Sequence, residues 1–185
     1  MKAYQVTKKL KDFQVIKALH ASAFPGSQYV PMTFLLRRAK RNTINFNAYY
    51  DEDIFVGFAY TVTLNDLTYL FVFAIQSDIR SKGYGTQILN LIKEAYPTNR
   101  IVLNMLALDP KASDNEQRKR REKFYLKNGY SFADFSCEMN GNKLVVLFQN
   151  KTCTPEEFLA IFKEFWGPIL FAFFKPKIMV SKSDN

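Results

Sequence analysis

Residues 67–86 read LTYLFVFAIQSDIRSKGYGT, and this stretch decides the fold. Residues 67–75 are apolar almost throughout, which predicts a central strand that is buried on both faces. Gly83 and Gly85 follow, and the apolar residues after them recur at helical spacing as far as Tyr96. Glycines placed directly before a helix let a phosphate group approach the free N–H groups of its first turn. The stretch therefore predicts a strand, a phosphate-binding turn and a helix.

The flanking sequence extends this unit in both directions. Upstream, two helical patterns precede a meander of strands. Downstream, strands and helices alternate, and Asn140-Gly141-Asn142 closes a last hairpin. The pattern predicts strands at 3–7, 44–50, 54–63, 67–75, 101–108, 130–139 and 143–149, and helices at 8–24, 31–41, 86–96, 114–128 and from 154 onward. The Ser113 and Thr154 segments have the form of capping boxes. This order predicts an α/β (α+β) fold with a mixed sheet, in which an antiparallel meander precedes strand–helix–strand–helix–strand.

The length of 185 residues favours one domain, which we expect to span residues 1–150. Residues 151–185 then form a helix and an apolar tail that pack on this domain or extend it. The apolar stretch Trp166–Phe174 has about half the length of a membrane-spanning helix. The tail could pack on the core, cover an acceptor cleft, form a dimer interface or touch a membrane surface.

The N-terminal residues lack the apolar core of a secretory signal. The two cysteines, Cys137 and Cys153, form neither a disulfide framework nor a metal motif, and we interpret them as reduced, buried side chains. We therefore expect a soluble cytoplasmic protein without a bound metal.

The positive charge is concentrated at the N-terminal end of the chain. Residues 1–50 hold nine Lys or Arg and one Asp, within a net charge of +9 for the whole sequence. Such a charge can attract nucleic acid, acidic lipid or an anionic cofactor, but it is more often a solvated surface. A basic module that binds RNA or single-stranded DNA is therefore one alternative function.

The spacing around the glycines excludes two common phosphate-binding motifs. A P-loop requires Gly-Lys-Ser/Thr after a further glycine, and that tripeptide is absent here. A dinucleotide fingerprint requires a third glycine where Ile88 stands. Arg80 and Lys82 add positive charge to the turn, and Thr86 has a side chain that could cap the helix.

Two segments together resemble the GCN5-related N-acetyltransferase (GNAT) family. Residues 73–85 are similar to its acetyl-CoA signature, Gln/Arg-x-x-Gly-x-Gly/Ala after a small apolar strand end, and residues 124–130 match its Phe-Tyr-x-x-x-Gly-aromatic segment. The resemblance extends over the order of elements from about residue 3 to 150 and implies that the central strands splay apart. It also implies that acetyl-CoA is bound by Phe73, Ala74, Ile75, Arg80, Ser81, Lys82, Gly83, Tyr84, Gly85 and Thr86. In that scheme the backbone of 73–75 pairs with the pantetheine arm, and the N–H groups of 81–85, together with Thr86, hold the pyrophosphate.

The resemblance also implies a catalytic role for Tyr125. In the family, a tyrosine at this place protonates the departing CoA thiolate. A phenol with an ordinary pKa near 10 holds its proton at neutral pH, as that role requires. We expect Phe124 to pack inward and Tyr125 to point along the cleft; the simpler alternative is a helix tyrosine that only packs. The basic run 118–121 could meet adenosine phosphates or be a solvated helix face.

The sequence does not identify a general base for an amine acceptor. Asp66 and Asp109 flank predicted strands and could act through water, although turn residues are the simpler interpretation. Asn104 and Tyr60 are polar candidates on neighbouring strands, and His20, the single histidine, falls on a packing helix.

We therefore hypothesise an N-acetyltransferase that moves an acetyl group from acetyl-CoA to an unidentified amine of a small molecule or a protein. A GNAT fold that binds CoA without catalysis is the nearest alternative. A homodimer is possible, and we expect neither nucleic acid nor a membrane as a partner. The acceptor, the acyl chain length and the oligomeric state are left open by the sequence.

Overall fold

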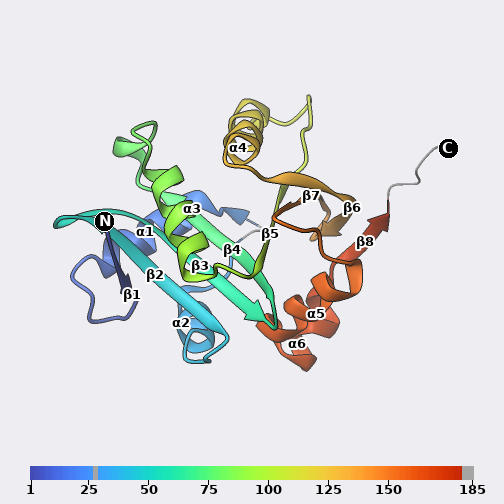
Figure 1. Cartoon of the computed structure of the whole chain (residues 1–185), viewed down its shortest axis with the longest axis horizontal. Coiled ribbons are helices and arrows are strands. Elements are labelled where there is room, and N and C mark those ends of the chain that lie inside the picture. The colour runs from blue at the N-terminus through green and yellow to red at the C-terminus, as the bar shows by residue number, and fades with distance from the viewer. Residues whose placement is uncertain (27–28, 181–185) are drawn as a thin grey trace. The chain divides into compact units, whose positions relative to one another are not determined.

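The computed structural model describes residues 1–26 and 29–180 (Figure 1). Its strands follow the order β1-β2-β3-β4-β5-β7-β6-β8, and the predicted mixed α/β fold is confirmed. The chain forms two compact units. The first contains residues 1–63 and 70–97, and the second contains residues 64–69 and the chain from Thr98 onward.

The sheet of the first unit is a meander. Its strands are β1 (Lys2–Gln5), β2 (Ile44–Asp51), β3 (Ile54–Leu64) and most of β4 (Leu67–Ile75). β2 pairs antiparallel with both β1 and β3, and a bulge falls between Tyr49 and Tyr50. Eight consecutive residues of β3, from Phe55 to Val62, are buried. An apolar strand buried on both faces needs helices on both sides, and the unit supplies them.

Three helices belong to this unit: α1 (Phe13–Ala23), α2 (Met32–Arg38) and α3 (Tyr84–Ala95). The α1 and α2 helices contact one face of β3. The His20 ring lies 6.2 Å from that of Phe58, and the Tyr60 hydroxyl donates to the Leu35 carbonyl over 3.1 Å. The α3 helix contacts the opposite face, because Thr61 points the other way and its hydroxyl lies 3.1 Å from that of Tyr96 just after α3.

The helix ends differ from the sequence-based boundaries. α1 begins at Phe13 instead of Lys8, because the preceding residues form tight turns with bonds between residues three apart, such as Leu10 N–H to Thr7 O. α2 likewise ends in such a turn at Arg38. These turns lie outside the regular i to i−4 pattern that hydrophobic periodicity detects.

The second unit is built on strands of mixed direction. Leu67–Tyr69, the start of β4, pair in parallel with β5 (Arg100–Leu106). Antiparallel pairs then join β5 to β7 (Asn142–Gln149), β7 to β6 (Ser131–Met139) and β6 to β8 (Lys177–Val180). The parallel register covers three positions and ends at Tyr69 and Val102.

The helices of the second unit are α4 (Asn115–Lys127), α5 (Pro155–Trp166) and α6 (Pro168–Phe174). α5 buries an apolar stripe, and its Phe162 ring lies 5.0 Å from that of Tyr69 on β4. The predicted capping box at Thr154 is confirmed: its hydroxyl accepts from Glu157 N–H, and the Glu157 carboxylate accepts from Thr154 N–H. Pro155 occupies the first turn, where its missing N–H costs nothing.

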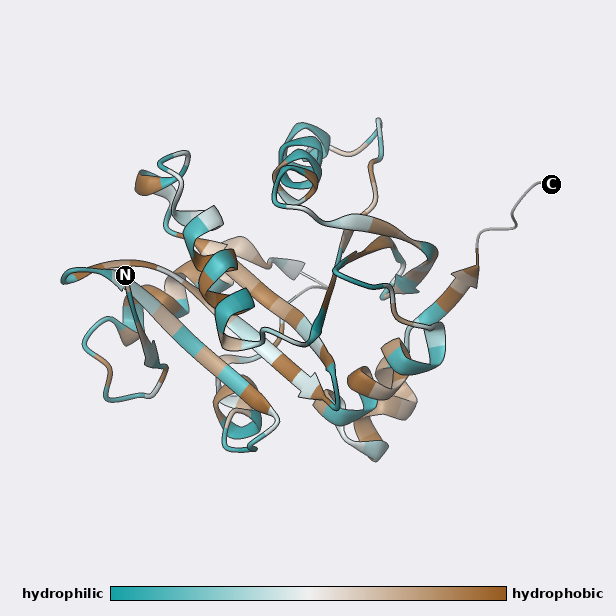
Figure 2. Ribbon diagram, viewed as in Figure 1, coloured by the Kyte–Doolittle hydropathy of each residue, from teal (hydrophilic) through white to brown (hydrophobic). Residues whose placement is uncertain are grey.

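The predicted capping box of α4 is wrong. The N-cap is Asp114 instead of Ser113, and its side chain makes no cap hydrogen bond. Its carboxylate instead accepts from Arg118 Nε one turn later, at 2.8 Å. Figure 2 shows α4 as hydrophilic around nearly its whole circumference, and Tyr125 is its one buried residue among those described.

Candidate active site

The predicted pantetheine-binding segment forms the end of β4. Ala74 is buried, whereas Phe73 and Ile75 are half-buried and share the opposite face of the strand. β3 approaches this segment closely, since a Cβ added at Gly57 would lie 2.4 Å from the Ala74 carbonyl oxygen. The Gln76 N–H then donates to the Val56 carbonyl over 2.9 Å, which holds the strand exit against β3.

The turn after β4 places backbone N–H groups in an accessible position. A 3-10 turn, η2 (Ser77–Ile79), leads to Ser81 and Gly83, which both have left-handed backbones with φ of +65° and +86°. Gly83 is the N-cap of α3, and the first regular helical bond runs from Gln87 N–H to Gly83 O. The three N–H groups of 84–86 therefore have no acceptor within the helix. They lie at the positive end of the helix dipole, an arrangement that suits a phosphate group, and we call residues 80–86 the cradle.

The structure refines the roles expected of individual cradle residues. α3 begins at Tyr84, two residues earlier than predicted, so Gly85 lies in its first turn and Thr86 is not the cap. Ser81, Lys82, Gly83 and Thr86 are exposed. Arg80 is also exposed, but its Nε donates to the Ile75 carbonyl over 3.1 Å. That bond ties the start of the cradle to the end of β4.

One contact of the cradle was missed by sequence reasoning. The Tyr84 hydroxyl donates to the Asp51 carboxylate over 2.8 Å, and Asp51 is the last residue of β2. The hydrogen bond to Asp51 raises the pKa of Tyr84. This bond commits the hydroxyl proton of Tyr84 to Asp51 and leaves its backbone N–H available to a cofactor. No local pattern links residues 33 positions apart, so the sequence held no signal for this pair.

Tyr125 lies in the second unit, on the last turn of α4. Its side chain is 7% exposed, and burial raises its pKa to about 12, against a smaller opposing effect from Arg121. Its ring lies 5.4 Å from that of Tyr130 at the start of β6. Phe124 is half-buried. We expected Phe124 to pack inward, and Tyr125 is the more deeply buried of the two.

The basic run 118–121 is partly used within α4 and its surroundings. Arg118 binds Asp114 and donates to the Ala107 carbonyl over 2.8 Å, and Lys119 binds Glu116 over 2.8 Å. These contacts favour a structural interpretation for the first half of the run.

Three of the polar side chains considered as general bases have structural partners. Both Asp66 carboxylate oxygens accept from the Arg100 guanidinium at 2.8 and 2.9 Å, which lowers the Asp66 pKa. Asp109 accepts from Lys111 N–H within its turn, and Asn104 accepts from the Tyr69 hydroxyl over 3.0 Å. The sequence-based interpretation of Asp66 and Asp109 as turn residues agrees with these contacts.

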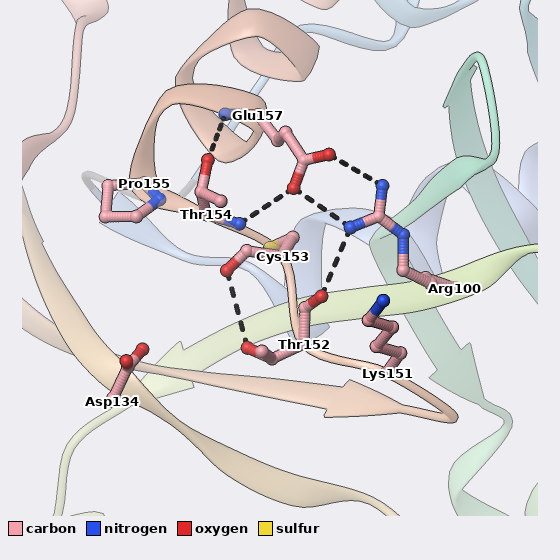
Figure 3. A pocket seen from close by; sticks show the side chains of 8 residues that line it. All are labelled: Arg100, Asp134, Lys151, Thr152, Cys153, Thr154, Pro155 and Glu157. Atoms are coloured by element: carbon pink, nitrogen blue, oxygen red, sulfur yellow. Dashed lines mark hydrogen bonds and ion pairs between the residues drawn. The ribbon is translucent and has the colours of Figure 1, made fainter.

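A cavity of about 350 Å³ lies in the second unit, and its lining includes no residue of either predicted segment (Figure 3). Arg100 forms a bidentate ion pair with Glu157 at 2.7 and 2.9 Å and also donates to the Thr152 carbonyl. These bonds lower the pKa of Glu157 and raise that of Arg100. Burial raises the pKa of the Cys153 thiol to about 11, so it is not a thiolate at neutral pH. The contacts in this cavity join β5 to the start of α5.

A smaller cavity of about 210 Å³ lies in the first unit, between α3 and the strands β2 and β3. Among the described residues, no group of His, Cys, Asp and Glu side chains could hold a metal ion. The structure thus brings the cradle residues together within the first unit and holds Tyr125 in the second.

Comparison with solved structures identifies the class of fold. A protein assigned to the GNAT family from Bacteroides thetaiotaomicron superposes with a TM-score of 0.69 at 20% identity, over 87% of this chain and 93% of that one. An aminoglycoside 6'-N-acetyltransferase complexed with coenzyme A gives 0.62 at 15% identity, over 84% and 99%. The ribosomal-protein-S18-alanine N-acetyltransferase from Escherichia coli gives 0.58 at 12% identity, over 84% and 96%. The fold is that of the GNAT acetyltransferases.

The sequence itself matches the family model described as the acetyltransferase (GNAT) domain over residues 13–147. The chain therefore belongs to the GNAT acetyltransferase family, and the resemblance seen in the sequence is confirmed. No curated protein sequence matches the chain.

Proposed function

We propose that this protein is an acetyl-CoA-dependent N-acetyltransferase, with the cradle 80–86 as its pyrophosphate site and Tyr125 as its proton donor. The observation that carries the proposal is the start of α3. There a left-handed Gly83 presents the unpaired N–H groups of the first helical turn, beside the exposed Lys82. Such a turn suits a diphosphate, and related folds are known in complex with coenzyme A.

The reaction follows from the chemistry of a thioester. A neutral amine attacks the carbonyl carbon, a C–N bond forms, and the C–S bond breaks with its electron pair staying on sulfur. The thiolate then takes the proton of the Tyr125 hydroxyl, and the phenolate regains a proton as the amide nitrogen loses one. The raised pKa of Tyr125, about 12, keeps the phenol protonated throughout the range in which acceptor amines become neutral.

The proposal is tested first by binding and then by turnover. Thermal unfolding is followed with and without acetyl-CoA, because a ligand that binds only the folded state raises the melting temperature. Release of the CoA thiol is then measured across a panel of amines that includes aminoglycosides and peptides with N-terminal alanine, the acceptor types named for similar folds.

Three outcomes separate the alternatives. A thermal shift with amine-dependent thiol release supports the N-acetyltransferase. A shift without release on any amine means that the chain binds CoA but does not catalyse transfer, and Tyr125 then has no catalytic role. No shift, together with salt-sensitive binding of RNA or single-stranded DNA, contradicts the proposal and favours the basic binding module.

A further inference from the structure

The C-terminal helix α6 is the most exposed apolar element among the described residues. Its seven residues, Pro168–Phe174, contain no polar side chain, and none of the seven is buried. Phe173 is 79% exposed and Ile169 is 77% exposed, the two highest values for large apolar side chains in this part of the chain. Exposed apolar groups at this density on a soluble protein indicate an interaction surface.

Three of the exposed residues of α6 lie on one face of the helix. Ile169, Ala172 and Phe173 are spaced by three and four residues and are all exposed. The other face is partly covered, because the Phe174 ring stacks on that of Trp166 at the end of α5, with centroids 4.5 Å apart. We call Ile169, Ala172 and Phe173 the α6 face. Figure 2 shows α6 in apolar colours beside α5.

Lysines outnumber acidic residues near the α6 face, where Glu164 follows Lys163 and Glu138 lies opposite Lys177 in the pairing of β6 with β8. Between Phe165 and Val180 the only charged residues are Lys175 and Lys177, and both are exposed. Lys163 is also exposed, one turn before the end of α5. An apolar face with aromatic side chains and flanking lysines fits the boundary between the headgroups and acyl chains of an anionic bilayer.

We propose that the α6 face docks on an anionic membrane surface, with Ile169 and Phe173 inserted among the lipids and Lys175 and Lys177 against the headgroups. No described helix is long and apolar enough to cross a membrane, and a surface-bound helix needs no such length. The proposal revises the sequence-based expectation of no membrane partner and takes up the membrane surface, one of the roles that the sequence left open for the tail. It is independent of the proposed acetyl transfer.

The charges favour a bilayer over a second copy of the chain as the occupant. A two-fold contact through the α6 face would place the same patch on both sides of the interface. Lys175 and Lys177 would then approach their own copies without acidic residues of the same segment to offset them. Anionic headgroups instead attract each lysine.

The chain contains a built-in reporter for the test. Trp166 is the single tryptophan, and its ring is stacked against α6. Vesicles of phosphatidylcholine mixed with phosphatidylglycerol should shift its emission to shorter wavelength, and brominated lipids should quench it. Vesicles of phosphatidylcholine alone should bind more weakly, and added salt should weaken binding to the mixed vesicles.

Variants assign the effect to the α6 face. Phe173→Ser should lower the vesicle partition coefficient at least about tenfold, because a phenyl group no longer leaves water. Ile54→Ser is the matched control: Ile54 is also strongly exposed, but it lies in the β2–β3 hairpin. Its partitioning should equal that of the unmodified protein, and circular dichroism should show both variants folded.

Four results would overturn the proposal. They are no binding of the unmodified protein to mixed vesicles, equal binding to both kinds of vesicle, equal binding by Phe173→Ser, or a dimer in sedimentation that Phe173→Ser dissociates. The last result would assign the α6 face to a second copy. Salt-sensitive binding that Phe173→Ser weakens and Ile54→Ser does not would support the membrane surface.

Discussion

Replacing Gly83 by alanine should separate cofactor binding from folding. Gly83 has φ of +86°, and an added Cβ would meet nothing within 4 Å. The free protein therefore loses only the cost of a left-handed alanine, about 1 kcal/mol. For a chain of this length, that cost lowers the melting temperature by about 2–4 °C. The variant should fold normally.

The complex should lose more than the free protein. The new methyl group should stand at the mouth of the cradle, where we expect it to displace a pyrophosphate from the N–H groups of 84–86. Loss of one hydrogen bond to a charged group costs about 1.5–3 kcal/mol. The affinity for acetyl-CoA should therefore fall about ten- to hundredfold.

Titration calorimetry with acetyl-CoA measures this loss, and Gly141→Ala is the matched control. Gly141 also has a positive φ, +75°, with open space around an added Cβ, but it lies in the β6–β7 hairpin. Both variants should melt at similar temperatures, and only Gly83→Ala should lose affinity. Equal affinity of the two variants for acetyl-CoA would refute the cradle assignment.

Further predictions concern other parts of the site and the core. Tyr125→Phe should lower turnover by about 10²-fold or more with unchanged acetyl-CoA affinity, as expected for loss of a general acid. Tyr130→Phe is the control, because the buried Tyr130 hydroxyl has no hydrogen-bond partner among the described residues. This variant should leave turnover unchanged and should not lower stability. Tyr84→Phe should weaken acetyl-CoA binding without preventing it, because the bond to Asp51 holds the first residue of α3; calorimetry showing unmodified affinity would remove that positioning role. Gly57→Ala should destabilise the protein, unlike Gly83→Ala, because its Cβ would lie 2.4 Å from the Ala74 oxygen; unaltered urea unfolding would contradict this. His20 is 1% exposed, and burial lowers its pKa to about 4. Below pH 6.5 the unfolded chain therefore binds a proton at His20, whereas the folded chain binds one only near pH 4. Stability should therefore fall by about 3 kcal/mol as the pH drops from 6.5 towards 4, and His20→Leu should remove that slope; an unchanged slope in urea unfolding at pH 7 and 5 would show that other groups cause it.

The strands were the most predictable part of the fold. β4 was predicted with its observed bounds, Leu67–Ile75, because a long apolar run between a turn and a glycine segment has few other interpretations. The helix starts were less predictable. The turns before Phe13 and the left-handed Gly83 are set by backbone conformations that hydrophobic periodicity does not encode. The short helix α6 was not predicted, because its unbroken apolar run has neither a helical nor a strand period. The strand β8 was not predicted, because its four residues are too few to show a period.

The candidate site divides in the same way. The cradle was found from its glycine spacing, since positive φ and close approach to a phosphate both demand glycine. The left-handed backbone of Ser81 was not predicted, because serine has no strong preference for that conformation. Tyr125 is more deeply buried than Phe124 because of which face of α4 packs on the rest of the unit. The sequence of a helix that is hydrophilic nearly all round does not indicate its packing face.

The ion pairs of Arg100 show a further limit of sequence reasoning. Arg100 joins Asp66, 34 residues before it, to Glu157, 57 residues after it. Only the folded chain brings these three together, and the contact accounts for Asp66 as a structural residue and not as a base.

The central claim is that the turn from Arg80 to Thr86 binds the pyrophosphate of acetyl-CoA. A crystal structure of the protein with bound CoA tests it most directly. We predict the diphosphate within hydrogen-bonding distance of the N–H groups of Gly83, Tyr84 and Gly85, with the pantetheine arm along Phe73–Ile75. A diphosphate bound anywhere else on the chain, with these N–H groups left to solvent, would contradict the account.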